Sequence, residues 1–201
     1  MGKVLVISEK PKVTKELLKS PRFKGSKKVA GSKPYYGYME NDRYINTWAI
    51  GHLLELFHPG DHDPQFKEFS FEHLPHIFEP KYKVIDRTKE QFEVIRSLTE
   101  RNDVESIINA LDDDREGELI FREIYEAVQS KKPVYRLKLS SYEPDELEAA
   151  LNRLVDGSEY DRIADSAKAR QYLDHLIGDT ITRASTVKLA GNQFLLSGGR
   201  V

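Results

Sequence analysis

Short apolar runs alternate with helically spaced apolar positions along most of the chain. Residues 3–8 form an apolar, β-branched run typical of a strand, and Pro11 stands where a first helical residue is expected. The pattern predicts strands at 3–8, 106–111 and 135–139, and helices at 11–18, 88–99, 116–128 and 144–154. Strands and helices that alternate in this order indicate an α/β fold with a mainly parallel sheet flanked by helices.

The remaining segments complete the outline of the chain. Residues 24–33 are rich in Gly, Ser and Lys and predict a loop, whereas 35–40 and 43–49 predict a hairpin. Residues 58–80 have no clear period and predict a long irregular excursion. A long helical segment follows residue 156 and stops abruptly before the Gly-rich end, so we expect a fragment of a longer protein. The predicted domains are 1–156 and 157–201, the second being the truncated start of a helical domain.

Composition narrows the classes of protein to be considered. The 201 residues are enough to bury a core, and they contain no apolar span near ~20 residues and no leader with a cleavage site. We therefore expect a soluble, cytoplasmic protein without a membrane function. Cysteine is absent, which excludes disulfides, thiolate zinc sites and a cysteine nucleophile within this chain.

Charge is distributed unevenly, although the formal net charge is only -2. Residues 1–33 contain ten Lys or Arg and two Glu. A basic segment of this kind is often no more than a solvated surface that keeps the protein soluble. Together with an acidic site elsewhere in the chain, it favours a polyanionic partner.

The acidic site is the sequence ALDDDREGE at 110–118, which directly follows a predicted buried strand. In an extended strand end Asp112 and Asp114 point the same way, so the two carboxylates can share one hard cation. The alternative is that an Asp here is only the N-cap of the following helix. That alternative explains one or two carboxylates, but three Asp with Glu116 and Glu118 repel one another unless a cation or an arginine offsets their charge.

Glu9 and Lys10 lie in the turn after the first predicted strand. The carboxyl ends of the strands are where open α/β sheets place their ligands, so we expect both residues near the acidic turn. Beside other carboxylates the neutral form of Glu9 should be favoured, which makes Glu9 a candidate general acid.

The order of these motifs resembles the N-terminal part of a type IA DNA topoisomerase, close to the topoisomerase III branch. The matching stretches are VISEKPKVTKEL from Val6, INTWAIGHLLEL from Ile45, ALDDDREGE, YRLKLSS from Tyr135, ARQYLDHLIGDTITRAST from Ala169 and the terminal LSGGRV. The resemblance implies a Rossmann-like Toprim domain, followed in 157–201 by the start of the helical DNA-binding domain. Leu111 and Asp113 depart from it, because the family usually has Thr and Pro there.

The resemblance also implies the chemistry of the site. Members of the family cleave and rejoin single DNA strands through a 5′-phosphotyrosine, with Mg²⁺ as the cofactor. Asp112, Asp114, Glu116 and Glu9 would hold the metal, and Glu9 and Lys10 would act in catalysis, with Glu9 donating a proton to the leaving 3′-oxygen. The implied contacts with single-stranded DNA are Lys10, His52, Arg115, Arg136, Lys168, Arg170 and Arg183. The other expected partners are the remaining domains of the same polypeptide, in a nucleoid-associated location.

All ten tyrosines fall in segments that match other parts of the family, so we expect the nucleophile to lie outside this chain and the chain to be inactive alone. Two alternatives remain open. The chain is then either a complete Toprim nuclease or primase-like enzyme, in which metal-bound water or a nucleotide hydroxyl replaces Tyr, or a non-catalytic single-stranded DNA-binding module.

Overall fold

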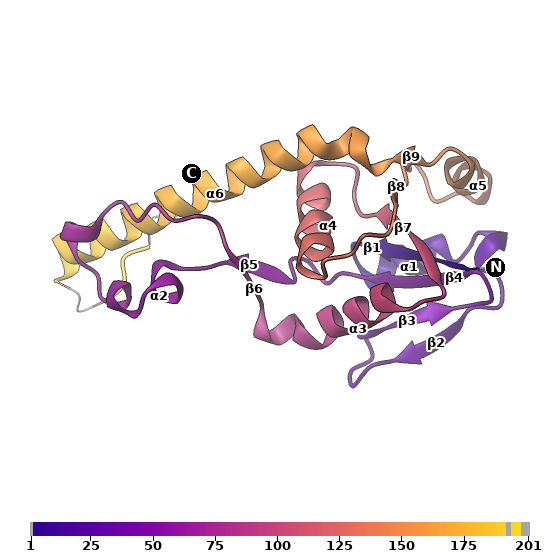
Figure 1. The fold of residues 1–201 in the computed structure, drawn as a ribbon, viewed down its shortest axis with the longest axis horizontal. Coiled ribbons are helices and arrows are strands. Elements are labelled where there is room, and N and C mark those ends of the chain that lie inside the picture. The colour runs from indigo at the N-terminus through magenta and orange to yellow at the C-terminus, as the bar shows by residue number, and fades with distance from the viewer. Residues whose placement is uncertain (1, 192–193, 198–201) are drawn as a thin grey trace. The chain divides into compact units, whose positions relative to one another are not determined.

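The computed structural model describes residues 2–191 and 194–197 (Figure 1). The chain packs into two compact units, Met1–Leu54 with Val84–Asp165, and Glu55–Lys83 with Ser166–Val201. The predicted boundary after residue 156 stays a prediction, but the excursion 55–83 packs with the second unit. Most of the terminal LSGGRV, residues 198–201, lies outside the described residues.

A mixed seven-stranded sheet forms the centre of the first unit. The strand order is β2 (Lys27–Ala30), β3 (Gly37–Glu40), β4 (Tyr44–Trp48), β1 (Lys3–Ser8), β7 (Val104–Ala110), β8 (Val134–Arg136) and β9 (Val155–Asp156). The four strands from β4 to β8 run parallel, and the pairings at both edges are antiparallel. The predicted α/β fold is therefore confirmed.

Helices cover both faces of this sheet. Leu17 of α1 (Pro11–Leu17) and Leu147 of α5 (Pro144–Asn152) share a core cluster with Val6 and Ile108. On the other face, Gln91 of α3 (Lys89–Glu100) donates a hydrogen bond to the Thr47 hydroxyl of β4, and Glu118 of α4 (Arg115–Ala127) accepts one from Asn109 of β7. The alternation of side chains along each strand sends successive residues to these two layers.

The strand register defines one functional edge of the sheet. Val29, Tyr38, Thr47, Ile7 and Asn109 lie in one row across β2, β3, β4, β1 and β7. The segments that follow β1 and β7, and the turn at 31–36 between β2 and β3, therefore lie at the same edge. This is the carboxyl edge of the parallel strands, where ligands of open α/β sheets bind.

The second unit contains a long helix and a set of short elements. β5 (Leu54–Leu56) and β6 (Tyr82–Val84) pair at its beginning, and α2 (Pro59–His62) and two 3₁₀ turns lie between them. Helix α6 (Asp161–Ser185) starts in the first unit and continues in the second. None of the helices within 2–191 and 194–197 is long and apolar enough to cross a membrane.

One predicted loop is a strand in the structure. Residues 27–30 form β2, although 24–33 was predicted to be irregular. All four residues of β2 are exposed, and the strand is held by antiparallel pairing with β3. Backbone pairing at a sheet edge needs no buried side chain, so no apolar alternation marked this strand.

Candidate metal site at the carboxyl edge of the sheet

The acidic turn connects the end of β7 to the start of α4. The Asp114 carboxylate is the N-cap of α4 and accepts a hydrogen bond of 2.7 Å from the backbone N–H of Gly117. A Cβ atom on Gly117 would lie 2.3 Å from the Asp112 carbonyl oxygen, so the turn requires a glycine at this position. The N-cap alternative is therefore correct for Asp114, although it does not account for Asp112.

The side chain of Arg136 holds the backbone of the acidic turn in place. Its guanidinium donates to the carbonyl oxygens of Leu111 at 2.9 Å and Asp112 at 2.5 Å, and lies 3.5 Å from the Glu118 carboxylate. The residue is only 1% exposed. The side chain is thus used inside the protein in this structure, and the DNA contact expected of Arg136 stays a prediction.

Glu118 is a structural member of the acidic cluster. It is 1% exposed, accepts a hydrogen bond of 2.9 Å from Asn109, and pairs with Arg122 at 2.7 Å as well as with Arg136. Two guanidinium groups offset its charge, as a buried carboxylate requires. The repulsion inferred from the sequence is thus relieved at this position by arginine rather than by a metal.

Glu9 and Asp112 form the centre of the site. Their carboxyl groups are hydrogen-bonded to each other, and the Lys10 ammonium pairs with Glu9. Two carboxyl groups in a hydrogen bond must share a proton, because two ionised carboxylates would repel each other. The pair joins the ends of β1 and β7, as the sequence predicted.

The pKa values of the two carboxyl groups are shifted in opposite directions. The hydrogen bond from Glu9, burial and the charge of Glu9 all raise the pKa of Asp112. Burial opposes the ionisation of Glu9, but the hydrogen bond with Asp112 and the Lys10 ammonium outweigh it and leave the pKa of Glu9 below its ordinary value. The pKa of Glu9 is thus shifted away from the expected neutral form, since the Lys10 ammonium pairs directly with Glu9 and acts on Asp112 through its charge alone. The role of Glu9 as a general acid stays a prediction.

The four predicted metal ligands do not all converge. Among the described residues, no group of three or more His, Asp or Glu side chains lies in a geometry that encloses a metal ion. Asp114 caps α4 and Glu116 pairs with His52, which leaves Glu9 and Asp112 together. Without a cation the two carboxyl groups must share a proton. They suit a hydrated cation such as Mg²⁺, which prefers oxygen ligands and takes only a few of them from the protein.

His52 lies between two carboxylates of α4. Its Nε2 is 2.9 Å from Glu116 and its Nδ1 is 3.0 Å from the buried Glu123. The hydrogen bond with Glu123 raises the pKa of His52 to about 9. Burial acts in the opposite direction, and Glu116 adds to the rise. His52 is thus a cation near the metal candidates, and its predicted DNA contact stays a prediction. Glu123 was missed, although it stands two helical turns after Glu116 on the same face of α4.

The two departures from the family pattern have different surroundings. Leu111 is buried, and its backbone is held by Asn109 and Arg136. Asp113 accepts a hydrogen bond of 2.8 Å from the Tyr160 hydroxyl and lies 3.6 Å from Arg136. The extra charge of Asp113 is therefore engaged by Tyr160 and Arg136.

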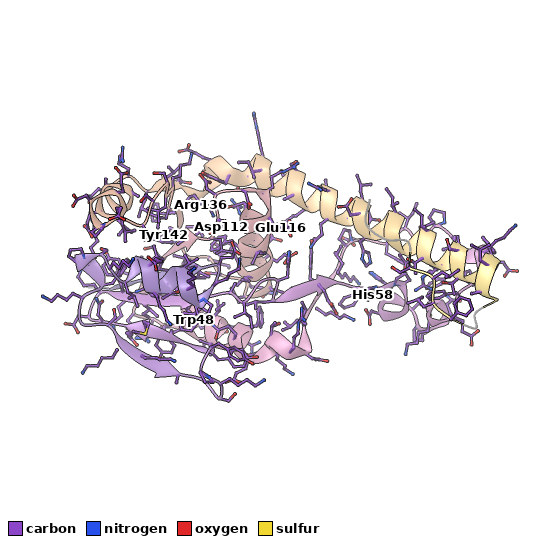
Figure 2. The ribbon with its side chains drawn as sticks, turned by 180° about the vertical axis from the view of Figure 1, so that it is seen from behind. Trp48, His58, Asp112, Glu116, Arg136 and Tyr142 are labelled. Carbon is purple, nitrogen blue, oxygen red and sulfur yellow. The ribbon has the colours of Figure 1, made fainter. Side chains whose placement is uncertain are left out.

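A cavity of about 100 Å³ adjoins the acidic turn. Asp112 and Asp113 line it together with apolar residues and Tyr142, and Figure 2 labels Asp112, Arg136 and Tyr142 in this region. Burial and the charges of Asp112 and Glu9 raise the pKa of Tyr142. The sequence did not mark Tyr142 as a site residue, because nothing in its spacing distinguishes it from the other tyrosines.

The remaining predicted DNA contacts differ in exposure. Lys10 and Arg115 are exposed at the first turns of α1 and α4, Arg170 is exposed on α6, and Lys168 is partly exposed. Arg183 is only 4% exposed. Its guanidinium donates to Asp179 at 2.8 Å and to the Phe66 carbonyl at 2.7 Å, so the side chain is engaged within the protein and its DNA contact stays a prediction.

Comparisons with known proteins support one family. The profile of the Toprim domain matches residues 4–142. DNA topoisomerase 1 of Bacillus anthracis is 58% identical over 184 residues, which are 92% of this chain and 21% of that protein. DNA topoisomerase 3 of Bacillus subtilis strain 168 is 38% identical over 202 residues, which are 100% of this chain and 26% of that protein.

The fold has a counterpart among solved structures. Full-length topoisomerase I from Thermotoga maritima superposes with a TM-score of 0.62 at 19% identity, over 97% of this chain and 27% of that chain. At this identity the likeness concerns the fold alone. The chain spans only 21% to 27% of the length of these three proteins.

Proposed function

The chain belongs to the Toprim domain family, and from this premise we propose that it is the Mg²⁺-binding, DNA-contacting part of a type IA DNA topoisomerase. The whole protein would cleave and rejoin single DNA strands through a 5′-phosphotyrosine. The observation that carries the proposal is the hydrogen-bonded pair of Glu9 and Asp112, which faces the carboxyl edge of the sheet beside an exposed lysine.

The proposed metal ligands are Glu9 and Asp112, with Asp114 and Glu116 as further oxygen donors. When bound, Mg²⁺ would neutralise the charge of a phosphodiester group. The side chain of Lys10 is 60% exposed, and its ammonium can donate to a phosphate oxygen. We retain Glu9 as the proposed proton carrier to the departing 3′-oxygen, because it belongs to the pair that shares a proton.

We further propose that the attacking tyrosine lies outside this chain. Tyr142 is the tyrosine at the cavity beside Asp112, but its raised pKa makes the phenolate harder to form. The Tyr160 hydroxyl donates a hydrogen bond to Asp113, and the residue is 6% exposed. Neither hydroxyl is therefore suited to attack a phosphate group.

Metal binding provides the first test of this assignment. Titration calorimetry with MgCl₂ should detect weak binding to the chain, and Asp112→Asn should weaken it by at least ~tenfold because a ligand is lost. Asp42→Asn is the matched control, since Asp42 is exposed in the turn between β3 and β4 at the opposite edge of the sheet. Equal Mg²⁺ affinity of the Asp112 variant and the unaltered chain would contradict the proposed site.

Incubation with supercoiled plasmid and Mg²⁺ provides the second test. The chain should bind single-stranded oligonucleotides but leave the plasmid supercoiled, because the nucleophile is absent. Relaxation by the chain alone would disprove the half-site assignment. Nicking that is lost in Asp112→Asn would instead identify a Toprim nuclease.

A further inference from the structure

The turn between β2 and β3 presents an aromatic ring and two ammonium groups to solvent. Tyr35 is 46% exposed, whereas its neighbour Tyr36 is 3% exposed. The Lys33 ammonium lies 5.8 Å from the ring centre of Tyr35 and 5.7 Å from that of Tyr36. Lys28 donates a hydrogen bond of 2.8 Å to the Pro34 carbonyl, so its ammonium is held at the same turn.

The turn is fixed to the body of the first unit. The indole N–H of Trp48 (labelled in Figure 2) donates to the Tyr35 carbonyl at 2.7 Å, and the Tyr36 hydroxyl donates to the Arg87 carbonyl at 2.7 Å. Gly37 closes the turn at φ 116°, where a Cβ would lie 2.1 Å from the Val29 carbonyl oxygen. The exposed ring of Tyr35 therefore stands on a defined backbone rather than on a loose loop, which reduces the entropy lost on binding.

All charged residues in the surrounding sequence are basic. Residues 17–39 contain six Lys or Arg and no Asp or Glu. Glu90 is the acidic group that reaches this turn from α3, and it is engaged by the backbone N–H and the hydroxyl of Ser32. A cationic surface with an exposed aromatic ring is the combination that binds single-stranded nucleic acid, through phosphate contacts and base stacking.

The turn also lies on the functional edge of the sheet. Because β2 runs parallel to β1, the residues after Ala30 leave the sheet at the edge where Glu9 and Asp112 lie. β2 is three strands from β1, which at about 4.8 Å per strand gives a separation of about 14 Å. A strand bound at the Glu9 and Asp112 pair can therefore extend along the edge to this turn.

We propose that Tyr35, Lys33 and Lys28 form a separate subsite for single-stranded nucleic acid, in which a base stacks on Tyr35 and the two ammonium groups bind the flanking phosphates. The inference rests on the proposed function, since it assumes that a nucleic-acid strand crosses this edge. A single strand is favoured over a duplex because the Tyr35 ring can stack only on a base that is not already stacked on both sides.

The test measures binding of fluorescein-labelled single-stranded oligonucleotides to the chain by fluorescence anisotropy, without Mg²⁺. Tyr35→Ala should weaken binding at least about fivefold, whereas Tyr35→Phe should bind like the unaltered chain because the ring remains. Lys28→Gln and Lys33→Gln should each reduce the slope of log K against log salt by about 0.7. Lys131→Gln is the control, since Lys131 is exposed just before β8 at the opposite edge of the sheet.

The outcomes separate this subsite from the proposed function. If the chain binds single strands and Tyr35→Ala binds equally well, the subsite is wrong while the proposed function stands. If the unaltered chain binds no oligonucleotide, the proposed DNA contact and the subsite are both wrong. Equal affinity for single-stranded and duplex DNA, unchanged by Tyr35→Ala, would likewise overturn the stacking role.

A second measurement tests the subsite without a substitution that could affect folding. An oligonucleotide that carries 5-iodouracil should photo-crosslink to the unaltered chain, and mass spectrometry should place the crosslink on Tyr35. Crosslinks that occur only on other residues would refute the proposal. The fluorescence of Trp48, which contacts the turn and is the only tryptophan of the chain, reports whether each variant is folded.

Discussion

Replacement of His52 by Gln should make the stability of the first unit less dependent on pH. His52 lies between Glu116 and Glu123, and its pKa is about 9 in the folded chain. An unfolded histidine titrates near ~6.5. Because the folded pKa is the higher one, the stabilisation is fully present below pH ~6.5 and is lost as the pH rises through about 9.

The magnitude follows from the shift in pKa. A rise from 6.5 to about 9 corresponds to roughly 3 kcal/mol, at ~1.4 kcal/mol per pKa unit. The side chain of His52 is 31% exposed, so screening by solvent reduces this figure to about 2 kcal/mol. His52→Gln should therefore lower the free energy of unfolding by about 2 kcal/mol more at pH 6 than at pH 9.5.

Urea unfolding followed by the fluorescence of Trp48 measures this difference. Trp48 is 4% exposed and belongs to the same unit as His52. The solutions contain EDTA, so that a metal does not compete for Glu116. The control is Glu116→Gln, which should remove only the smaller part of the pH dependence because Glu123 contributes most to the raised pKa of His52.

One result would refute this reasoning about His52. A difference between His52→Gln and the unaltered chain that stays constant from pH 6 to pH 9.5 would mean that the imidazole is neutral in the folded state. The contacts with Glu116 and Glu123 would then be ordinary hydrogen bonds, worth about 1 kcal/mol each and independent of pH in this range.

Two further changes test how the acidic turn is held. Gly117→Ala should lower the free energy of unfolding by about 2 kcal/mol and weaken Mg²⁺ binding, because its Cβ would overlap the Asp112 carbonyl; unchanged urea midpoint and calorimetric affinity would contradict the close approach. Arg136→Met should lower the free energy of unfolding in urea by about 3 to 5 kcal/mol, because the buried Glu118 loses one of its two cationic partners. Arg115→Met, on the surface, should change it little. If both arginine variants changed the free energy of unfolding equally little, Arg136 would not support the turn.

The fold was predictable where side-chain burial left a periodic pattern. The strands β1 and β7 and the helices α3 and α4 begin and end within a few residues of their predicted positions. β2 was missed because it is an exposed edge strand held by backbone pairing. The packing of 55–83 with the second unit was also missed, since contacts over long sequence separations leave no local period.

The candidate site was predictable in composition but not in orientation. Glu9 and Asp112 meet because both follow parallel strands, which is a consequence of topology. Arg136 and Arg183 were predicted to contact DNA, yet both are buried and engaged within the protein. The sequence reports a charge at these positions, whereas the direction of a long side chain depends on the carbonyl and carboxylate groups that fold beside it.

The acidic turn shows why a run of carboxylates need not be a set of converging ligands. Asp114 is satisfied by the N-terminus of α4, Glu116 by His52 and Glu118 by two arginines. Lys10 offsets the charge of Glu9. The hydrogen bond from Glu9, burial and the charge of Glu9 raise the pKa of Asp112, although the charge of Lys10 acts in the opposite direction. A cation at Asp112 would therefore relieve the repulsion between Asp112 and Glu9, and it must compete with His52 to recruit Glu116.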